Sequence, residues 1–291
     1  MVETRRVRAG VREVAVDVYG RYGPWVLLLH GIPGWRGTFR GVAERLAPDH
    51  RVAVPDLLGF GDSDPAPRGA HADLQADMVI GLLDALGVPS AHLVGFDYGG
   101  PIALLTYSSA EARVSSLTLA ATNVFADARI PLPLKIAKVP LAGDVAFRLA
   151  FSRPGLLALW RVATCDREAF PLSRYLGALR SSQGVTSTQR VFLESLRYMR
   201  PRYHQVEEAL PLVDVPRTVV WGDRDPFFPV EAGERTADAL AARFVLLEGC
   251  GHFVPEERPE ELADEVRRLT RQVTLAELEE TGPGPRPQPR V

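Results

Sequence analysis

The stretch HLVGFDYGGPIAL, residues 92–104, decides the fold of this chain. An apolar run at residues 91–96 ends in a glycine-rich turn, and a second apolar run, residues 99–109, follows at once. The first run suits a strand buried on both faces of a parallel sheet, and the second suits a helix. Glycines around the turn leave room for a sharp bend and a closely packed helix. We therefore predict a strand–turn–helix unit with Asp97 at its apex.

The same alternation of strand and helix runs through most of the chain. Helices are predicted at residues 38–47, 72–86 and 259–273, each with apolar residues at helical spacing. Further strands are predicted at residues 14–19, 25–29, 51–55, 114–121, 216–221 and 243–247. Such alternation predicts an α/β fold, with a mostly parallel central sheet flanked by helices.

One region interrupts the alternation. Residues 124–212 contain no convincing buried strand and carry several helical stretches, so we expect an inserted helical cap over the carboxyl edge of the sheet. Residues 1–123 and 213–273 then form the core. The Pro/Gly-rich end of residues 274–291 has little to bury and is expected to be disordered.

Composition narrows the class of protein. The 291 residues carry a net charge of −2 and are 46% hydrophobic, as in an ordinary globular protein. The sequence has no dense basic block, signal peptide or membrane-length apolar run, so we expect a cytoplasmic protein without nucleic-acid or membrane partners. Two cysteines do not indicate a disulfide framework. A homodimer is compatible with the sequence, and no metal cluster or cofactor motif is apparent.

Three polar motifs follow predicted strands in a fixed order. The GFDYG turn, residues 95–99, has the outline of the G-x-S-x-G nucleophile elbow with Asp97 in the serine position. WGDRDP, residues 221–226, supplies an acid, and GCGHF, residues 249–253, supplies His252. Each motif alone could be a turn or a loop, but three in the order nucleophile, acid, histidine favour a catalytic site. The last acid of GDRD, Asp225, is the predicted partner of His252, and Asp223 is expected to satisfy backbone groups of its turn.

A fourth motif, HGIPG at residues 30–34, follows another buried strand. Oxyanion stabilisation needs backbone N–H groups held in a fixed loop. The N–H groups of Ile32 and Tyr98 are the predicted donors, and His30 is predicted to be structural.

Together these motifs resemble the α/β-hydrolase superfamily over residues 10–273. The aspartate in the elbow is similar to the branch that contains epoxide hydrolases and haloalkane dehalogenases. The resemblance implies that Asp97 attacks an sp³ carbon and forms an alkyl ester, which water activated by His252 and Asp225 then hydrolyses. It also implies a small-molecule substrate, an apolar epoxide, and tyrosine proton donors on the cap. The cap offers Tyr175, Tyr198 and Tyr203, of which we expect Tyr198 as donor, with Tyr175 as its partner.

Alternatives stay open at this point. Trp35 and Phe227 are expected in the substrate pocket. Trp35 and Trp160 could serve a halide leaving group in a dehalogenase. However, Ile32 and Tyr98 both depart from the dehalogenase pattern. A carbon–carbon bond or ester hydrolase with Asp97 as a base is a further reading. A catalytically silent binding protein on the same fold is the alternative from another class.

Overall fold

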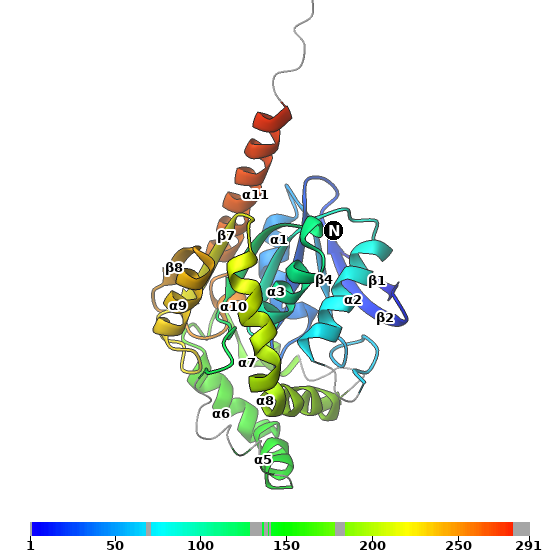
Figure 1. Cartoon of the computed structure of the whole chain (residues 1–291). Helices are drawn as coiled ribbons and strands as arrows, with labels where there is room; N and C mark the ends of the chain where they lie inside the picture. Colours follow the sequence, from blue (N-terminus) through cyan, green and yellow to red (C-terminus); the bar gives the residue numbers. More distant parts are fainter. Residues whose placement is uncertain are drawn as a thin grey trace, which may run out of the picture.

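The computed structural model describes residues 2–67, 71–128, 136, 139, 141–177 and 184–281. These residues form an eight-stranded sheet in the order β1-β2-β4-β3-β5-β6-β7-β8, flanked by helices (Figure 1). The strands are β1 Val2–Ala9, β2 Arg12–Tyr19, β3 Trp25–Leu29, β4 Arg51–Pro55, β5 Ala91–Phe96, β6 Val114–Ala120, β7 Arg217–Gly222 and β8 Arg243–Leu247. The pairings of β2 with β1 and β4 are antiparallel, and all the others are parallel. The predicted α/β class with a mostly parallel sheet is confirmed.

Strand β5 runs through the middle of the sheet, between β3 and β6. All six of its residues are buried, as the continuous apolar run predicted. Because β5, β7 and β8 are parallel, the turns that follow them open at the same carboxyl edge. That edge is where open α/β sheets bind ligands.

Two hydrophobic layers cover the two faces of the sheet. Alternate residues of one strand divide between them, with Leu27 and Leu29 in one cluster and Val26 and Leu28 in the other. The first layer is covered by α2 (Ala72–Ala85), α3 (Gly99–Ser109) and α9 (Val230–Leu240), and the second by α1 (Arg40–Leu46) and α11 (Pro259–Thr281).

The described chain between β6 and β7 contains helices joined by loops, and no strand. It forms α5 (Ala142–Ala150), α6 (Arg153–Ala163), α7 (Leu172–Gly177), α8 (Gly184–Ala209) and a short 3-10 turn, Leu210–Leu212. Figure 1 shows α5, α6 and α8 gathered at one end of the molecule, away from the projecting end of α11. We call this helical segment the cap. In the described part of the chain, no helix is both long and apolar enough to cross a membrane.

The structure differs from the sequence predictions at the chain ends. The Arg-rich strand β1 was not predicted, because it is largely exposed and has only β2 as a partner. Strand β2 is therefore an inner strand. Helix α11 continues beyond the predicted end at residue 273 to Thr281, so the start of the predicted disordered tail is helical. The rest of that tail, residues 282–291, lies outside the described residues.

Candidate active site

Asp97 occupies the sharp turn between β5 and α3. Its φ of +50° lies in the left-handed region, which non-glycine residues adopt only when their surroundings hold them there. Its backbone N–H donates to Ala120 O at 3.1 Å, and the Thr122 hydroxyl donates to its carbonyl at 2.5 Å. A side chain at Gly95 would put a Cβ 2.4 Å from Gly99 O, so this tight turn requires glycine there. The strained aspartate is thus fixed with its carboxylate above the sheet.

The acid and the histidine meet this carboxylate at the carboxyl edge. The His252 Nδ1 and Asp225 Oδ2 atoms are 2.8 Å apart, and His252 Nε2 lies 3.8 Å from Asp97 Oδ2. The other Asp225 oxygen accepts hydrogen bonds from the Phe227 and Phe228 N–H groups, so the acid is held on both sides. Asp225 is fully buried and His252 nearly so. The structure therefore brings the three predicted residues together.

The electrostatic interactions among Asp97, Asp225 and His252 affect the pKa values of Asp97 and His252. Burial alone lowers the pKa of His252, but the Asp225 and Asp97 carboxylates outweigh it and raise that pKa above its ordinary value. Burial raises the pKa of Asp97, while His252 and the Ile32 and Tyr98 N–H groups oppose the rise. A desolvated carboxylate beside a histidine is the arrangement expected of a nucleophile and its base.

The predicted oxyanion loop reaches Asp97 directly. The Ile32 N–H donates to Asp97 Oδ1 at 2.7 Å, and the Tyr98 N–H lowers the pKa of this carboxylate. This approach requires glycine at 31, because a Cβ there would lie 2.5 Å from both Cβ and Oδ1 of Asp97. One carboxylate oxygen therefore accepts the Ile32 N–H, while the other faces His252.

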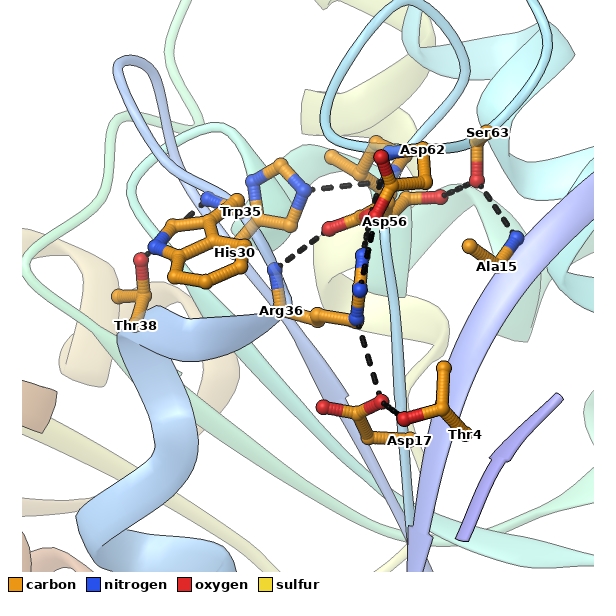
Figure 2. Close-up of polar contacts among 11 residues, drawn as sticks. Thr4, Ala15, Asp17, His30, Trp35, Arg36, Thr38, Asp56, Asp62 and Ser63 are labelled. Carbon is orange, nitrogen blue, oxygen red and sulfur yellow. Dashed lines mark hydrogen bonds and ion pairs between the residues drawn. The ribbon is translucent and has the colours of Figure 1, made fainter. Parts of the chain in front are cut away.

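A network of polar contacts around His30, Arg36 and Asp56 fixes the oxyanion loop (Figure 2). The His30 Nδ1 atom donates to Gly31 O at 2.9 Å, and its Nε2 atom accepts from Leu57 N–H at 3.0 Å. Burial lowers the pKa of His30, which fits this neutral tautomer. Arg36 bonds to the buried Asp56, and its backbone N–H donates to the same carboxylate at 2.7 Å. His30 thus has the structural position that the sequence predicted.

Arg36 also contacts Asp17 at 3.2 Å and Asp62 at 2.8 Å. It therefore ties strand β2 and the loop after β4 to the oxyanion loop (Figure 2).

The loop that carries His252 is bound to the cap. The His252 N–H donates to Ala163 O, at the end of α6, at 2.9 Å. The buried Glu257 accepts hydrogen bonds from the backbone N–H groups of Cys165 and Asp166 in the cap and of Gly251 in the loop, at 2.8, 2.8 and 3.2 Å.

Within the core, Asp223 accepts from the Cys250 N–H at 3.1 Å. Asp223 therefore binds a backbone group, as predicted, but that group belongs to the loop that carries His252 rather than to its own turn.

A cavity of about 440 Å³ lies over the carboxylate, between the core and the cap. Asp97, His252 and Phe227 line it. Most of the remaining wall is apolar, and six of its larger side chains are Phe147, Phe151, Phe192, Leu196, Phe228 and Phe253. Apart from His252, no described residue of the wall can carry a positive charge. The cavity therefore suits a neutral, apolar ligand.

Trp35, expected in the pocket, is not among the described residues of this wall. Its ring lies beside Arg36 and Gly37. The Trp160 Nε1–H group donates to Phe170 O at 2.9 Å, so that donor already has a partner.

Tyr198 and Tyr175 were the predicted proton donors on the cap. Tyr175 packs its ring against Phe170 and Phe253 and is not among the described lining residues. The side chain of Tyr198 lies outside the described residues. Instead, Tyr203 of α8 and Tyr98 border the cavity.

The sequence offered Tyr203 among the cap tyrosines, but Tyr203 was not predicted as a proton donor. A usable signal was present, because positions 195, 199 and 203 recur at i, i+4 and i+8 on one helix face. The helical spacing of these three residues could be recognised in the sequence, but the sequence did not show which face of the helix lines the cavity.

Groups of three or more potential metal ligands do not occur among the described residues.

Comparison with known proteins agrees with the fold. Residues 24–259 match the family model described as alpha/beta hydrolase fold. The chain is 26% identical over 253 residues to 2-hydroxy-6-oxononadienedioate/2-hydroxy-6-oxononatrienedioate hydrolase 1 of Dechloromonas aromatica, which covers 84% of each protein.

Two solved structures are similar over nearly the whole chain. The epoxide hydrolase CorEH has a TM-score of 0.76 at 22% identity, covers 94% of this chain and 99% of its own, and supports the fold alone. A thermophilic esterase from Thermogutta terrifontis has a TM-score of 0.74 at 26% identity and the same coverage. The match to the family model spans more than half of the chain, and the chain therefore belongs to the alpha/beta-hydrolase fold family, whose members named here are hydrolases.

Proposed function

We propose that this hydrolase opens an apolar epoxide to a vicinal diol through an alkyl ester on Asp97. The divided environment of the Asp97 carboxylate carries the proposal. Its Oδ1 atom accepts the Ile32 N–H at 2.7 Å, and its Oδ2 atom lies 3.8 Å from His252 Nε2. After Oδ2 is alkylated, Oδ1 becomes the ester carbonyl oxygen and already accepts the Ile32 N–H, which would stabilise its oxyanion.

The same geometry supports the second step. In the ester, Asp97 no longer carries the negative charge that helps to raise the pKa of His252. His252 therefore becomes a neutral base when a water must be activated to attack Cγ of Asp97. Asp225, 2.8 Å from Nδ1, keeps Nε2 unprotonated and stabilises the imidazolium as it forms.

Ring opening also needs an acid for the epoxide oxygen. Tyr203 is a described cap tyrosine in the cavity wall. Its phenol interacts electrostatically with the Asp97 carboxylate. Burial first, and then Tyr98 and Asp97, raise the pKa of this phenol, so it remains protonated at neutral pH. We assign the role of cap proton donor to Tyr203 rather than to Tyr175.

Two observations argue against a dehalogenase and against a hydrolase of dicarboxylate substrates. A halide leaving group needs N–H donors in an apolar wall, and no tryptophan occurs among the described lining residues. The curated relative acts on dienedioates, which carry two carboxylates. A described wall without arginine or lysine offers such a substrate no partner for its charge.

The intact mass of His252→Gln after incubation with terminal epoxides and haloalkanes tests this proposal. We expect an added mass equal to the whole epoxide, mapped to the peptide that contains Asp97, because the ester forms but is not hydrolysed. The control His252→Gln/Asp97→Asn should remain unlabelled. An alkyl group added without its halogen would instead assign the protein to the dehalogenases. No adduct on a folded His252→Gln, together with a parent that forms no diol, would favour a binding protein.

A further inference from the structure

Glu257 is a buried acid that the mechanism above does not use. It ends the short helix α10 (Val254–Glu257), which follows His252, and it is only 3% exposed. Among the described residues no cation forms an ion pair with it, and the neighbouring Arg258 contacts Asp166 and Glu261 instead. A buried carboxylate is costly unless other groups compensate its charge, so its place in the fold needs an explanation.

Three backbone N–H groups converge on one oxygen of Glu257. Its Oε2 atom accepts from the cap residues Cys165 and Asp166, at 2.8 Å each. The same oxygen accepts the N–H of Gly251 at 3.2 Å, in the loop of residues 249–253 that carries His252. Hydrogen bonds to a charged acceptor are stronger than those between neutral groups. One carboxylate oxygen therefore fixes the cap and the His252 loop at a common point.

This point lies next to the catalytic base in the chain. Gly251 directly precedes His252, whose own N–H donates to Ala163 O at 2.9 Å. A Cβ at position 251 would lie 2.3 Å from that carbonyl oxygen and 2.8 Å from Glu257 Oε1, so only glycine allows this approach. Two successive N–H groups of the loop are thus held, one by Glu257 and the other by the cap backbone.

From these contacts we propose that Glu257 is a positioning residue, which holds the His252 loop against the cap so that the imidazole can activate water for ester hydrolysis. The inference rests on the proposed function. His252 Nε2 lies 3.8 Å from Asp97 Oδ2, and a misplacement of about 1 Å at such a distance can cost about 10²-fold in rate. Ester formation does not use His252 as a base, so it should depend much less on Glu257.

The charge of Glu257 also acts on the base. Burial has the largest effect on the pKa of His252 and lowers it. Asp225, then Asp97 and then Glu257 oppose that effect. Once Asp97 is esterified and neutral, the carboxylates of Asp225 and Glu257 remain to stabilise the imidazolium that forms as water attacks.

The test separates the two chemical steps in single turnovers with a terminal epoxide, in which rapid-quench mass spectrometry follows the ester on Asp97. Glu257→Gln keeps an oxygen for the three N–H groups but removes the charge, and Glu257→Ala removes both. We expect ester formation within about threefold of the parent, and hydrolysis about 10-fold slower in Glu257→Gln and about 10²-fold slower in Glu257→Ala. Glu256→Gln is the matched control, because its buried carboxylate contacts Arg174 of the cap at 2.8 Å rather than the His252 loop.

The pKa of His252 is a second readout, which a merely structural role would not move. Nitrogen NMR of the histidine rings, assigned with His252→Gln, should show this pKa lower by about 0.5 in Glu257→Gln and unchanged in Glu256→Gln. Because the weaker base stays neutral at lower pH, the acid limb of ester hydrolysis should move in the same direction. Glu257→Gln carries the test if Glu257→Ala does not fold.

Three outcomes would overturn the role of Glu257 while leaving the ester on Asp97 established. They are a Glu257→Gln with the hydrolysis rate and His252 pKa of the parent, an equal loss in formation and hydrolysis, and the same loss in Glu256→Gln. The absence of any epoxide adduct on folded His252→Gln would instead overturn the proposed function and this inference together.

Discussion

Replacing Asp225 by Asn should stop the enzyme at the alkyl ester. An asparagine keeps the Oδ1 acceptor for the Phe227 and Phe228 N–H groups, so the loop should stay folded. Its amide would face His252 Nδ1 with a donor and favour the tautomer protonated at Nε2, which cannot act as a base. At 2.8 Å and an effective dielectric constant of about 20, the lost attraction for the imidazolium is about 6 kcal/mol. That energy corresponds to about 10⁴-fold in the hydrolysis rate, the size of effect known when a catalytic histidine loses its carboxylate.

The assay is a pre-steady-state comparison of adduct and diol. Asp225→Asn should show a burst of ester on Asp97 close to one equivalent, followed by diol release about 10⁴-fold slower than in the parent. Asp223→Asn is the matched control, because the amide can still accept the Cys250 N–H and Asp223 does not touch His252. Ester hydrolysis within about tenfold of the parent in Asp225→Asn would refute the reasoning, as would an equal loss in Asp223→Asn.

Three further predictions concern residues that flank the site. Burial raises the pKa of Glu256 from 4.5 to about 7, although Arg174 opposes the rise, so the folded protein binds more protons than the unfolded chain within that window. Stability should therefore fall by about 3 kcal/mol as pH rises from 4.5 to 7, and Glu256→Gln should flatten this slope in urea titrations. Gly31→Ala should abolish adduct formation in a folded protein, because its Cβ would occupy the space of the Asp97 carboxylate; a normal burst in mass spectrometry would contradict this. Arg36→Ala leaves the fully buried Asp56 without its cation and should cost about 3–5 kcal/mol in chemical denaturation, whereas Asp62→Asn, at a half-exposed acid, should cost less than about 1 kcal/mol.

The strands at the centre of the sheet could be predicted because burial on both faces leaves a continuous apolar run. The inner strands β3, β4 and β5 have the predicted bounds, and so does the edge strand β8. The edge strand β1 has no such signal, because nearly all of its residues are exposed to solvent and need not be apolar. Helix α11 extends further than predicted because its polar end needs only helix propensity, not packing, to continue.

In the candidate site, the residues of the core could be predicted from the sequence and those of the cap could not. Asp97, Asp225, His252 and Ile32 could be predicted because each follows a strand, and parallel strands bring their ends to one edge. The cap residues could not, since the faces that α8 turns toward Asp97 depend on how the helices pack rather than on a local pattern. This is why Tyr203 lines the cavity whereas Tyr175 packs against Phe253.

The bonds between the His252 loop and the cap have a consequence for how substrate enters. Ala163 O holds the His252 backbone, and Glu257 joins Cys165 to Gly251. This end of the cap therefore cannot move away from the core without displacing the His252 backbone. On the proposed mechanism, substrate would enter where the cap is not bonded to this loop, because an opening here would separate His252 from Asp97.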